Sequence, residues 1–418
     1  MATKNTDIDI RTAGKAVRET EEGMFSEQCY EWGSKRSAIR ELFEYGKQRV
    51  AVVGEENVYD FSLGNPTVPA PDEVGEAIRD ILATETSIQI HGYTSAQGDA
   101  TVRKAIADYL NQTYGTHFHQ DNFYMTCGAA ASLCITFHAL VESPEDEIIA
   151  IAPYFPEYKV FVEGSGAKFV MVEPDMENFQ IDLAALDGAV NEHTRAVIVN
   201  SPNNPSGVVY TEETVEKLAL LLNEKASEFG HPVYLVTDEP YREIVYDGIQ
   251  VPFVTKYYKD TIVCYSYSKS LSLPGERIGY ILVPDEAAES RRLYLSVCGA
   301  GRKLGYVCAP SLMQQVVARC QGKVGDINAY KENRDILYDG LRKLGYECVH
   351  PDGAFYMFVK AFGGDSGAFC EKAKEFDLLL VAADGFGCPG YVRVSYCVDK
   401  EMIERSLGAF AKLAEAYR

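Results

Sequence analysis

The chain has 418 residues, of which 46% are hydrophobic and 24% charged, so it can bury a large core and exceeds the usual length of one domain. Its formal net charge of −21 argues against nucleic acid and anionic membranes as partners, because both select basic surfaces. The sequence has no apolar stretch of about 18 residues, no signal-peptide pattern, and no Cys or His spacing typical of metal sites. We therefore expect a cytoplasmic protein with reduced thiols, without a metal and without a membrane partner.

Hydrophobic patterns along the chain predict an α/β fold. Residues 1–23 are polar and without periodicity, which predicts a flexible tail, and a helical pattern begins at Glu27. Further on, segments of helical period such as residues 212–228 alternate with short apolar runs such as residues 148–151 and 233–236. This alternation predicts a mostly parallel sheet flanked by helices.

The C-terminal third predicts a smaller α+β domain. We expect a long helical stretch over residues 311–344, strands over 354–359 and 391–396, and a closing helix from Lys400. The predicted division is residues 24–62 and 305–418 for the small domain and residues 63–304 for the large domain.

A glycine turn follows the predicted strand over residues 123–126. Gly128 ends the strand, and an alanine-rich helix starts at Ala129. Free N–H groups at a helix N-terminus bind phosphate well, although a glycine turn before a helix is a weak signal by itself.

A rigid turn is expected after the β-branched run over residues 194–199. Pro202, Pro205 and Gly207 exclude a helix or a central strand, so Asn204 lies at the carboxyl end of a strand, where α/β sheets bind ligands. The alternative is a plain Asn-Pro turn without a ligand.

Asp238 and Tyr241 follow another apolar strand, over residues 233–236. A carboxylate at this position is costly to bury unpaired, and a protonated ring nitrogen would pair with it. Tyr241 could then hydrogen-bond to a phenolate oxygen on the same ring. The alternative is that Asp238 caps a following helix and that Tyr241 packs in the core.

Lys269 ends the run Ser266-Tyr267-Ser268-Lys269, and Arg277 follows eight positions later. Desolvation lowers the pKa of a lysine in an apolar pocket, so that its free amine can attack a carbonyl and form a Schiff base. Serine hydroxyls and a planar guanidinium suit a phosphate. The run predicts an aldehyde cofactor that carries a phosphate, and the alternative is a solvated turn with a surface lysine.

In this order and spacing, the four motifs resemble the class I/II aminotransferase family, pyridoxal-phosphate enzymes with the aspartate aminotransferase fold (fold type I). The resemblance runs from about Ser62 to Arg393, and it also includes residues 63–66, 91–98 and 152–158. It implies pyridoxal 5'-phosphate as the cofactor and amino acids and 2-oxo acids as substrates.

The resemblance gives each matching residue a role. Lys269 corresponds to the Schiff-base lysine, Asp238 to the partner of the pyridine nitrogen, and Tyr241 to a donor to the ring oxygen. The implied cofactor-binding residues are Ala129, Ala130, Phe155, Asn204, Asp238, Tyr241, Ser266, Lys269, Arg277 and Tyr93, and the implied substrate-binding residues are Gly64, Asn204 and Arg393. In the family, the tyrosine that matches Tyr93 reaches the phosphate of the neighbouring subunit, which implies a homodimer with shared active sites.

Ala130 departs from one subgroup of the family. Aspartate-preferring members of that subgroup carry a lysine in the glycine turn, which holds the distal carboxylate of the substrate. Arg302, or an arginine from the partner subunit, could replace it. The amino donor and the 2-oxo acid therefore stay open.

The favoured function is transfer of an amino group from an α-amino acid to a 2-oxo acid through a Lys269 Schiff base. A lyase, decarboxylase or synthase is the alternative, because such enzymes of the family share the same cofactor cup. A transcription regulator with an aminotransferase-like domain is disfavoured, since roughly 60 residues before Ser62 leave little room for a DNA-binding module.

Overall fold

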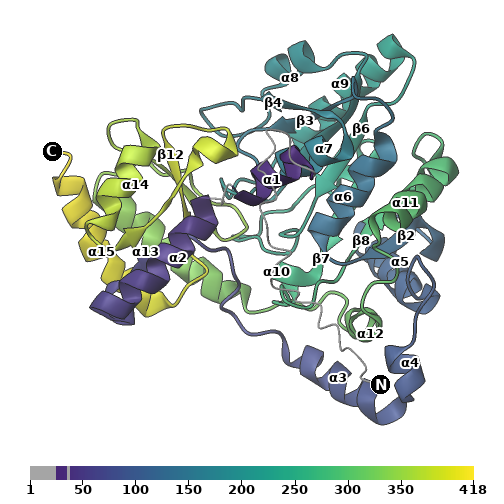
Figure 1. Cartoon of the computed structure of the whole chain (residues 1–418), viewed down its shortest axis with the longest axis horizontal. Coiled ribbons are helices and arrows are strands. Elements are labelled where there is room, and N and C mark those ends of the chain that lie inside the picture. The colour runs from purple at the N-terminus through teal and green to yellow at the C-terminus, as the bar shows by residue number, and fades with distance from the viewer. Residues whose placement is uncertain (1–24, 35–37) are drawn as a thin grey trace, which may run out of the picture.

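The computed structural model describes residues 25–34 and 38–418, so the tail predicted over residues 1–23 lies outside the described residues. The larger part of the molecule is built on a seven-stranded sheet with the order β2-β8-β7-β6-β5-β3-β4 (Figure 1). Its strands are β2 (Phe123–Thr126), β3 (Glu147–Ile151), β4 (Lys168–Val172), β5 (Thr194–Asn200), β6 (Tyr234–Asp238), β7 (Thr261–Ser266) and β8 (Gly279–Leu282). The strands β3 to β7 pair in parallel, whereas β8 pairs antiparallel with β2 and β7. The predicted, mostly parallel sheet is confirmed.

Helices cover both faces of this sheet. The helices of this part of the molecule are α3 (Asp72–Thr84), α4 (Ser87–His91), α5 (Ala100–Tyr114), α6 (Ala129–Leu140), α7 (Glu157–Ser165), α8 (Leu183–Ala189), α9 (Glu212–Phe229), α10 (Tyr267–Ser270), α11 (Ser290–Leu304) and α12 (Ser311–Arg319). Side chains alternate between the faces of a strand, so Ile148 of β3 packs with residues of α6 and α7, and Ile149 packs with residues of α8 and α9. Because both faces are covered, the strands of this sheet are continuous apolar runs.

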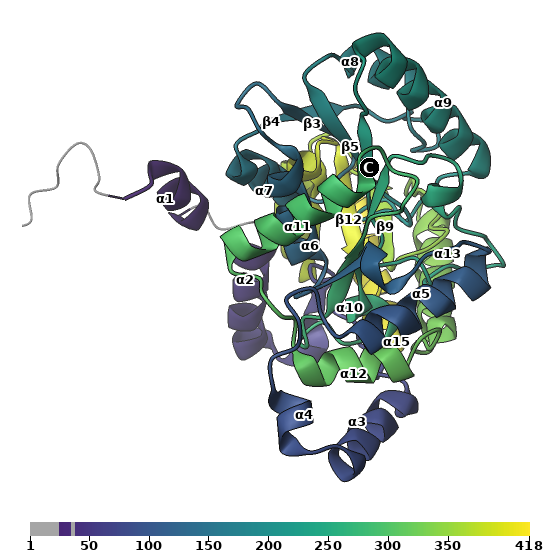
Figure 2. The same cartoon turned by 90° about the vertical axis from the view of Figure 1, so that its right-hand side faces the viewer.

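A smaller part lies beside the sheet, at the left of Figure 1. It contains a three-stranded antiparallel sheet of β11 (Val381–Ala382), β12 (Tyr391–Ser395) and β9 (Tyr356–Lys360), and a parallel pair of β1 (Tyr59–Asp60) and β10 (Leu378–Leu379). Its helices are α2 (Ala38–Val53), α13 (Ile327–Lys343), α14 (Ser366–Lys374) and α15 (Lys400–Glu415). The N-terminal helix α1 (Glu27–Ser34) projects away from the body (Figure 2). The predicted strands near residues 354–359 and 391–396 and the closing helix are confirmed.

The helical stretch predicted over residues 311–344 consists of two helices, α12 and α13, with a break between them. The chain leaves α12 after Arg319, turns at Gly322 with a φ of 74°, and starts α13 at Ile327, where the Asp326 side chain accepts the first free N–H groups. The helix α12 also packs against α3 and α5 of the larger part. The division at residue 304 stays a prediction, and these contacts favour a boundary between α12 and α13.

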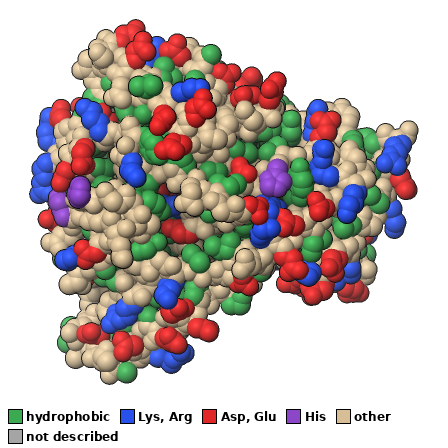
Figure 3. Space-filling model, turned by 180° about the vertical axis from the view of Figure 1, so that it is seen from behind, with side chains coloured by type: hydrophobic (Ala, Val, Ile, Leu, Met, Phe, Trp, Pro, Cys, Tyr) green, Lys and Arg blue, Asp and Glu red, His purple; other side chains and the backbone are tan. Residues whose placement is uncertain are grey.

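The helix lengths and the surface charges bear on possible partners rather than on the fold. No helix within residues 25–34 and 38–418 is long and apolar enough to cross a membrane. Acidic side chains are spread over the face shown in Figure 3, interspersed with lysine and arginine. Substrates that carry a carboxylate must therefore be attracted by cations inside a site rather than by the surface as a whole.

Candidate active site

The sequence motifs meet in one cavity of about 300 Å³ at the carboxyl ends of the parallel strands. The strands β5, β6 and β7 end at Asn200, Asp238 and Ser266, and all three residues line the cavity. The predicted site residues that line it are Gly64, Ala129, Ala130, Phe155, Asn204, Asp238, Tyr241, Ser266, Lys269, Arg277 and Arg393. The smaller part closes the cavity with Arg393 and Tyr356.

Lys269 reaches the cavity from the short helix α10. The Ser266 side chain caps this helix by accepting the Ser268 N–H, so the lysine follows the strand end within one turn. The Nζ atom of Lys269 donates to the Gly64 carbonyl oxygen at 2.6 Å and lies 5.3 Å from the centre of the Phe355 ring. Burial lowers the pKa of Lys269 to about 8. At pH 7 about a tenth of this amine is therefore uncharged and nucleophilic, far more than for a lysine with an ordinary pKa.

Asp238 is buried at the end of β6, with 6% of its surface exposed. The Tyr158 hydroxyl donates to its Oδ2 atom at 2.6 Å, whereas Oδ1 has no hydrogen-bond partner among the described residues. Burial raises the pKa of Asp238 to about 7, against the lowering effect of the Tyr158 hydrogen bond. A cation or a protonated nitrogen at Oδ1 would restore the charged form.

The alternative roles proposed for Asp238 and Tyr241 have different outcomes. No helix begins after Asp238, since the chain runs through turns over residues 240–243, so the helix-cap alternative is wrong. Tyr241 does belong to a buried core, where its ring packs edge-on against Phe355 at 5.4 Å. It also lines the cavity, and its hydroxyl lies 3.0 Å from that of Tyr356.

The part of the cavity next to Arg277 and the start of α6 has the features of an anion-binding site. Gly128 precedes α6 with a φ of 89°, and a Cβ atom there would lie 2.8 Å from an Arg277 guanidinium nitrogen. The N-terminus of α6 has no side-chain cap, and Ala129 and Ala130 of its first turn line the cavity. Arg277 donates one bond to the Pro274 carbonyl at 3.1 Å, and the Ser266 and Ser268 hydroxyls lie 2.7 Å apart.

Arg393 extends into the cavity from β12 of the smaller part. Its guanidinium donates to the Asn204 Oδ1 atom at 3.2 Å and to the Ser62 carbonyl oxygen at 2.5 Å. It lies 4.7 Å from the Tyr356 ring centre, and its buried Nε has no partner among the described residues. This fixed, partly unsatisfied guanidinium is suited to a carboxylate.

Tyr93 and Arg302 lie elsewhere. Tyr93 is 98% exposed in the loop after α4, and Arg302 is exposed in the last turn of α11. Neither residue lines the cavity.

The comparison with known proteins decides the family. Residues 56–410 match the family described as "Aminotransferase class I and II". The chain belongs to this family. Its members use pyridoxal 5'-phosphate, so the chain is a pyridoxal-phosphate-dependent aminotransferase that acts on amino acids and 2-oxo acids, as the sequence motifs predicted.

Relatives and solved structures agree with this assignment. A probable aspartate aminotransferase from Methanocaldococcus jannaschii is 30% identical over 402 residues, which are 94% of this chain and 100% of the relative. The crystal structure of an amino transferase from Eubacterium rectale is 64% identical, with a TM-score of 0.94 over 95% of this chain and 100% of that chain. Aspartate aminotransferase from Thermus thermophilus with maleate is 26% identical, with a TM-score of 0.82 over 94% and 100%.

The cavity of this aminotransferase fits the cofactor of its family. The buried, unpaired Oδ1 of Asp238 suits a protonated pyridine nitrogen, and the cradle around Gly128 and Arg277 suits a phosphate. The Lys269 amine with its lowered pKa suits an aldehyde carbon. The residues that line one cavity thus provide a counterpart for each reactive part of pyridoxal phosphate.

Several lining residues were not predicted as site residues. They are Ile39, Leu133, Asn200, Pro240, Ser268, Pro274 and Tyr356, and Tyr158 contacts the site through Asp238. Tyr356 lies in an apolar run of the sequence, which is typical of a core aromatic, and both tyrosines are buried in the structure. Ser268 was within reach of the sequence argument, since it stands directly before Lys269.

Proposed function

We propose that the amino-group transfer takes place in this cavity, with Lys269 as the residue that carries protons. When bound, pyridoxal phosphate supplies an electron-accepting ring that stabilises negative charge at the substrate Cα. The observation that carries the proposal is that the Lys269 amine and the unpaired Asp238 Oδ1 line the same cavity. The reaction requires two groups from the protein. One is a base that moves the proton, which is Lys269 here, and the other is a carboxylate that keeps the cofactor ring able to accept electrons, which is Asp238.

Lys269 would attach the cofactor between turnovers and take the Cα proton of the substrate during turnover. Its lowered pKa allows a free amine at neutral pH, and the same amine can return the proton to C4′ of the cofactor. The Gly64 carbonyl accepts a hydrogen bond from Nζ and holds the amine in the cavity.

Asp238 would hold a proton on the ring nitrogen of the cofactor. The Tyr158 hydroxyl fixes its Oδ2 atom, so Oδ1 stays available for that nitrogen. Tyr241 and Asn204 are proposed to face the ring oxygen and Phe155 the ring face, because all three line the cavity around Lys269. The burial of Asp238 makes this pairing strong, since an unpaired charge would be costly there.

The phosphate and the substrate carboxylate would occupy opposite walls. The N–H groups of Ala129 and Ala130, the Ser266 hydroxyl and Arg277 line the phosphate side. Arg393, held by Asn204 and Ser62, lines the side where the α-carboxylate binds. The reacting Cα would then lie between these anchors, near Lys269.

The homodimer with shared sites is also part of the proposal. Tyr93 is a large aromatic side chain with 98% of its surface in solvent, and Ile88 in the preceding helix is 84% exposed. Burial against a second copy of the chain would remove this apolar surface from water. We propose that the Tyr93 hydroxyl completes the phosphate site of the partner subunit. A cytoplasmic location stays a prediction.

The identity of the substrate depends on how a second carboxylate would be held. Relatives are named for aspartate, but the cations that line this cavity are Lys269, Arg277 and Arg393 within residues 25–34 and 38–418. Ala130 has no charge to offer in the glycine turn. We propose that a dicarboxylate, if used, draws on a cation from the partner subunit.

The proposal is tested by mixing the holoenzyme with single amino acids and no 2-oxo acid. We expect the absorbance of the lysine-bound cofactor to convert to that of the amine form and a 2-oxo acid to accumulate in equal amount. Aspartate, glutamate and uncharged amino acids should be compared at equal concentration. Release of ammonia or carbon dioxide with the cofactor unconverted would instead place the reaction among the lyases or decarboxylases.

A further inference from the structure

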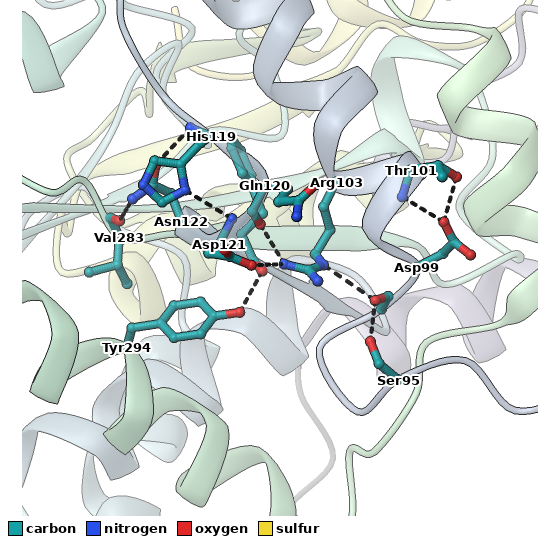
Figure 4. A network of polar contacts seen from close by, with 12 residues as sticks. Ser95, Asp99, Thr101, Arg103, His119, Gln120, Asp121, Asn122, Val283 and Tyr294 are labelled. Carbon is teal, nitrogen blue, oxygen red and sulfur yellow. Dashed lines mark hydrogen bonds and ion pairs between the residues drawn. The ribbon is translucent and has the colours of Figure 1, made fainter.

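The loop that carries Tyr93 is held firmly from inside, although the tyrosine itself lies in solvent. The Gly98 N–H donates to the Ser95 carbonyl at 2.9 Å. The Gly98 carbonyl accepts from Nε of Arg103 at 3.3 Å and from the Ser95 hydroxyl, and Figure 4 shows Ser95 and Arg103 lying close together. The Gln97 carbonyl accepts from the Met125 N–H of β2 at 2.9 Å. The residues after Tyr93 are therefore joined both to α5 and to the large sheet.

Gln314 is the side chain that links this loop to α12. It lies in the first turn of the helix and is fully buried, with 0% of its surface exposed. Its Oε1 atom accepts the Asp99 N–H at 2.8 Å, and its Nε2 atom donates to Thr94 Oγ1 at 3.3 Å and to the Ala309 carbonyl at 2.8 Å. One amide thus connects the neighbour of Tyr93 to the starts of two helices.

The fit around this amide is close. Gly98 has a φ of 99°, and a Cβ atom at that position would lie 2.9 Å from the Gln314 oxygen and 2.2 Å from Met125 Cγ. The Cys308 thiol also lies 3.3 Å from the Thr94 carbonyl oxygen, so the segment before α12 contacts the loop a second time. Buried amides with satisfied donors and acceptors specify one conformation, because any other leaves a polar group unpaired.

We propose that Gln314 is a positioning residue for Tyr93 and acts through it on the cofactor phosphate of the neighbouring subunit. This inference rests on the shared site of the proposed function. Gln314 does not line the cavity of its own subunit, and its side chain contacts Thr94, the neighbour of Tyr93. Because Tyr93 is proposed to reach the partner's site, the effect of Gln314 on cofactor affinity is expected at that site. An effect in trans is what separates positioning of Tyr93 from general support of the fold.

The test uses hybrid dimers purified by two different affinity tags. The first hybrid pairs a Lys269→Ala, Gln314→Leu chain with a wild-type chain. The second pairs a Lys269→Ala chain with a Gln314→Leu chain. In both hybrids one site carries Lys269, and cofactor affinity at that site is measured by titration with pyridoxal phosphate and borohydride trapping on the lysine.

We expect the first hybrid to bind the cofactor about tenfold more weakly than the wild type, the loss of about one hydrogen bond, and the second to bind it normally. The reason is that only in the first hybrid does the lysine-bearing site receive its Tyr93 from a chain without Gln314. Gln315→Leu is the matched control, because Gln315 lies next in α12 and its side chain donates to the Gln89 carbonyl, at 3.2 Å, rather than to the Tyr93 loop. A Gln314→Glu chain, which keeps the acceptor for Asp99, serves where the leucine variant does not fold.

Three results would overturn the inference. These are weakening in the second hybrid alone, equal weakening in both, and no weakening in either. The proposed function is tested separately by the same hybrids with Tyr93→Phe in place of Gln314→Leu. If Tyr93→Phe acts in trans and Gln314→Leu does not, the shared site stands and only the role of Gln314 is rejected.

Discussion

The Asp238 end of the cavity and the Tyr93 loop are built in opposite ways. Asp238 is buried, its Tyr158 contact comes from the same chain, and burial raises the pKa of its carboxyl to about 7. The Tyr93 side chain lies in solvent, while the side chain of its neighbour Thr94 accepts a hydrogen bond from Gln314 of the same chain. The groups around Asp238 thus come from one chain, whereas we propose that Tyr93 of a second chain completes the phosphate site. Variants in the first region should act in cis and variants in the second in trans.

The largest effect is expected for Lys269→Ala. Removing both the attachment point and the proton carrier should lower turnover by on the order of 10⁴-fold or more, because acid–base and covalent roles are lost together. Turnover and borohydride labelling are measured, with the exposed Lys217→Ala as control. Label on another lysine of the wild-type protein would contradict the assignment.

Asp238→Asn should lower turnover by about 10³-fold while cofactor stays bound. A neutral amide cannot keep the ring nitrogen protonated, so the ring accepts electrons less well. Steady-state rates and the cofactor absorbance check this, and Asp108→Asn on the surface of α5 is the matched control. Nearly normal turnover would remove the pairing role of Asp238.

Arg393→Lys should raise KM for amino acids by about 100-fold with a smaller change in kcat. Lysine keeps the charge but loses the planar fork that Asn204 and Ser62 hold in place. Initial rates over a range of substrate concentrations give both constants, and Arg405→Lys, remote from the cavity, is the control. A change confined to kcat would argue against carboxylate binding.

The burial of Asp238 also predicts a pH effect on the protein without cofactor. Its pKa is about 7 in the fold and near its ordinary value when unfolded, so the folded state binds more protons between about pH 4 and 7. Stability from this group should therefore fall as pH rises through that window. Urea unfolding should show the wild type losing about 2–3 kcal/mol relative to Asp238→Asn between pH 5 and 8. Parallel pH profiles for the two proteins would contradict the buried, unpaired carboxylate.

The sequence predicted the cavity residues that follow strand ends better than it predicted the residues that contact them. Lys269, Asp238 and Asn204 follow apolar strands, and the carboxyl ends of parallel strands meet at one edge of a sheet. Tyr158 and Tyr356 could not be distinguished from core aromatics, because their roles depend on partners that are 80 and 115 residues away in the sequence. The break between α12 and α13 was missed since apolar residues continue at helical spacing on both sides of Gly322.

The most direct test is the cofactor affinity of a hybrid between a Lys269→Ala chain and a Tyr93→Phe chain. Its lysine-bearing site lies in the Tyr93→Phe chain and, in a shared-site dimer, takes an intact Tyr93 from the other chain. We predict that this site binds pyridoxal phosphate with wild-type affinity, while the Tyr93→Phe homodimer binds about tenfold more weakly. Equal weakness in the hybrid and the Tyr93→Phe homodimer, or a fully active monomer, would contradict the division between a self-contained centre and a shared edge.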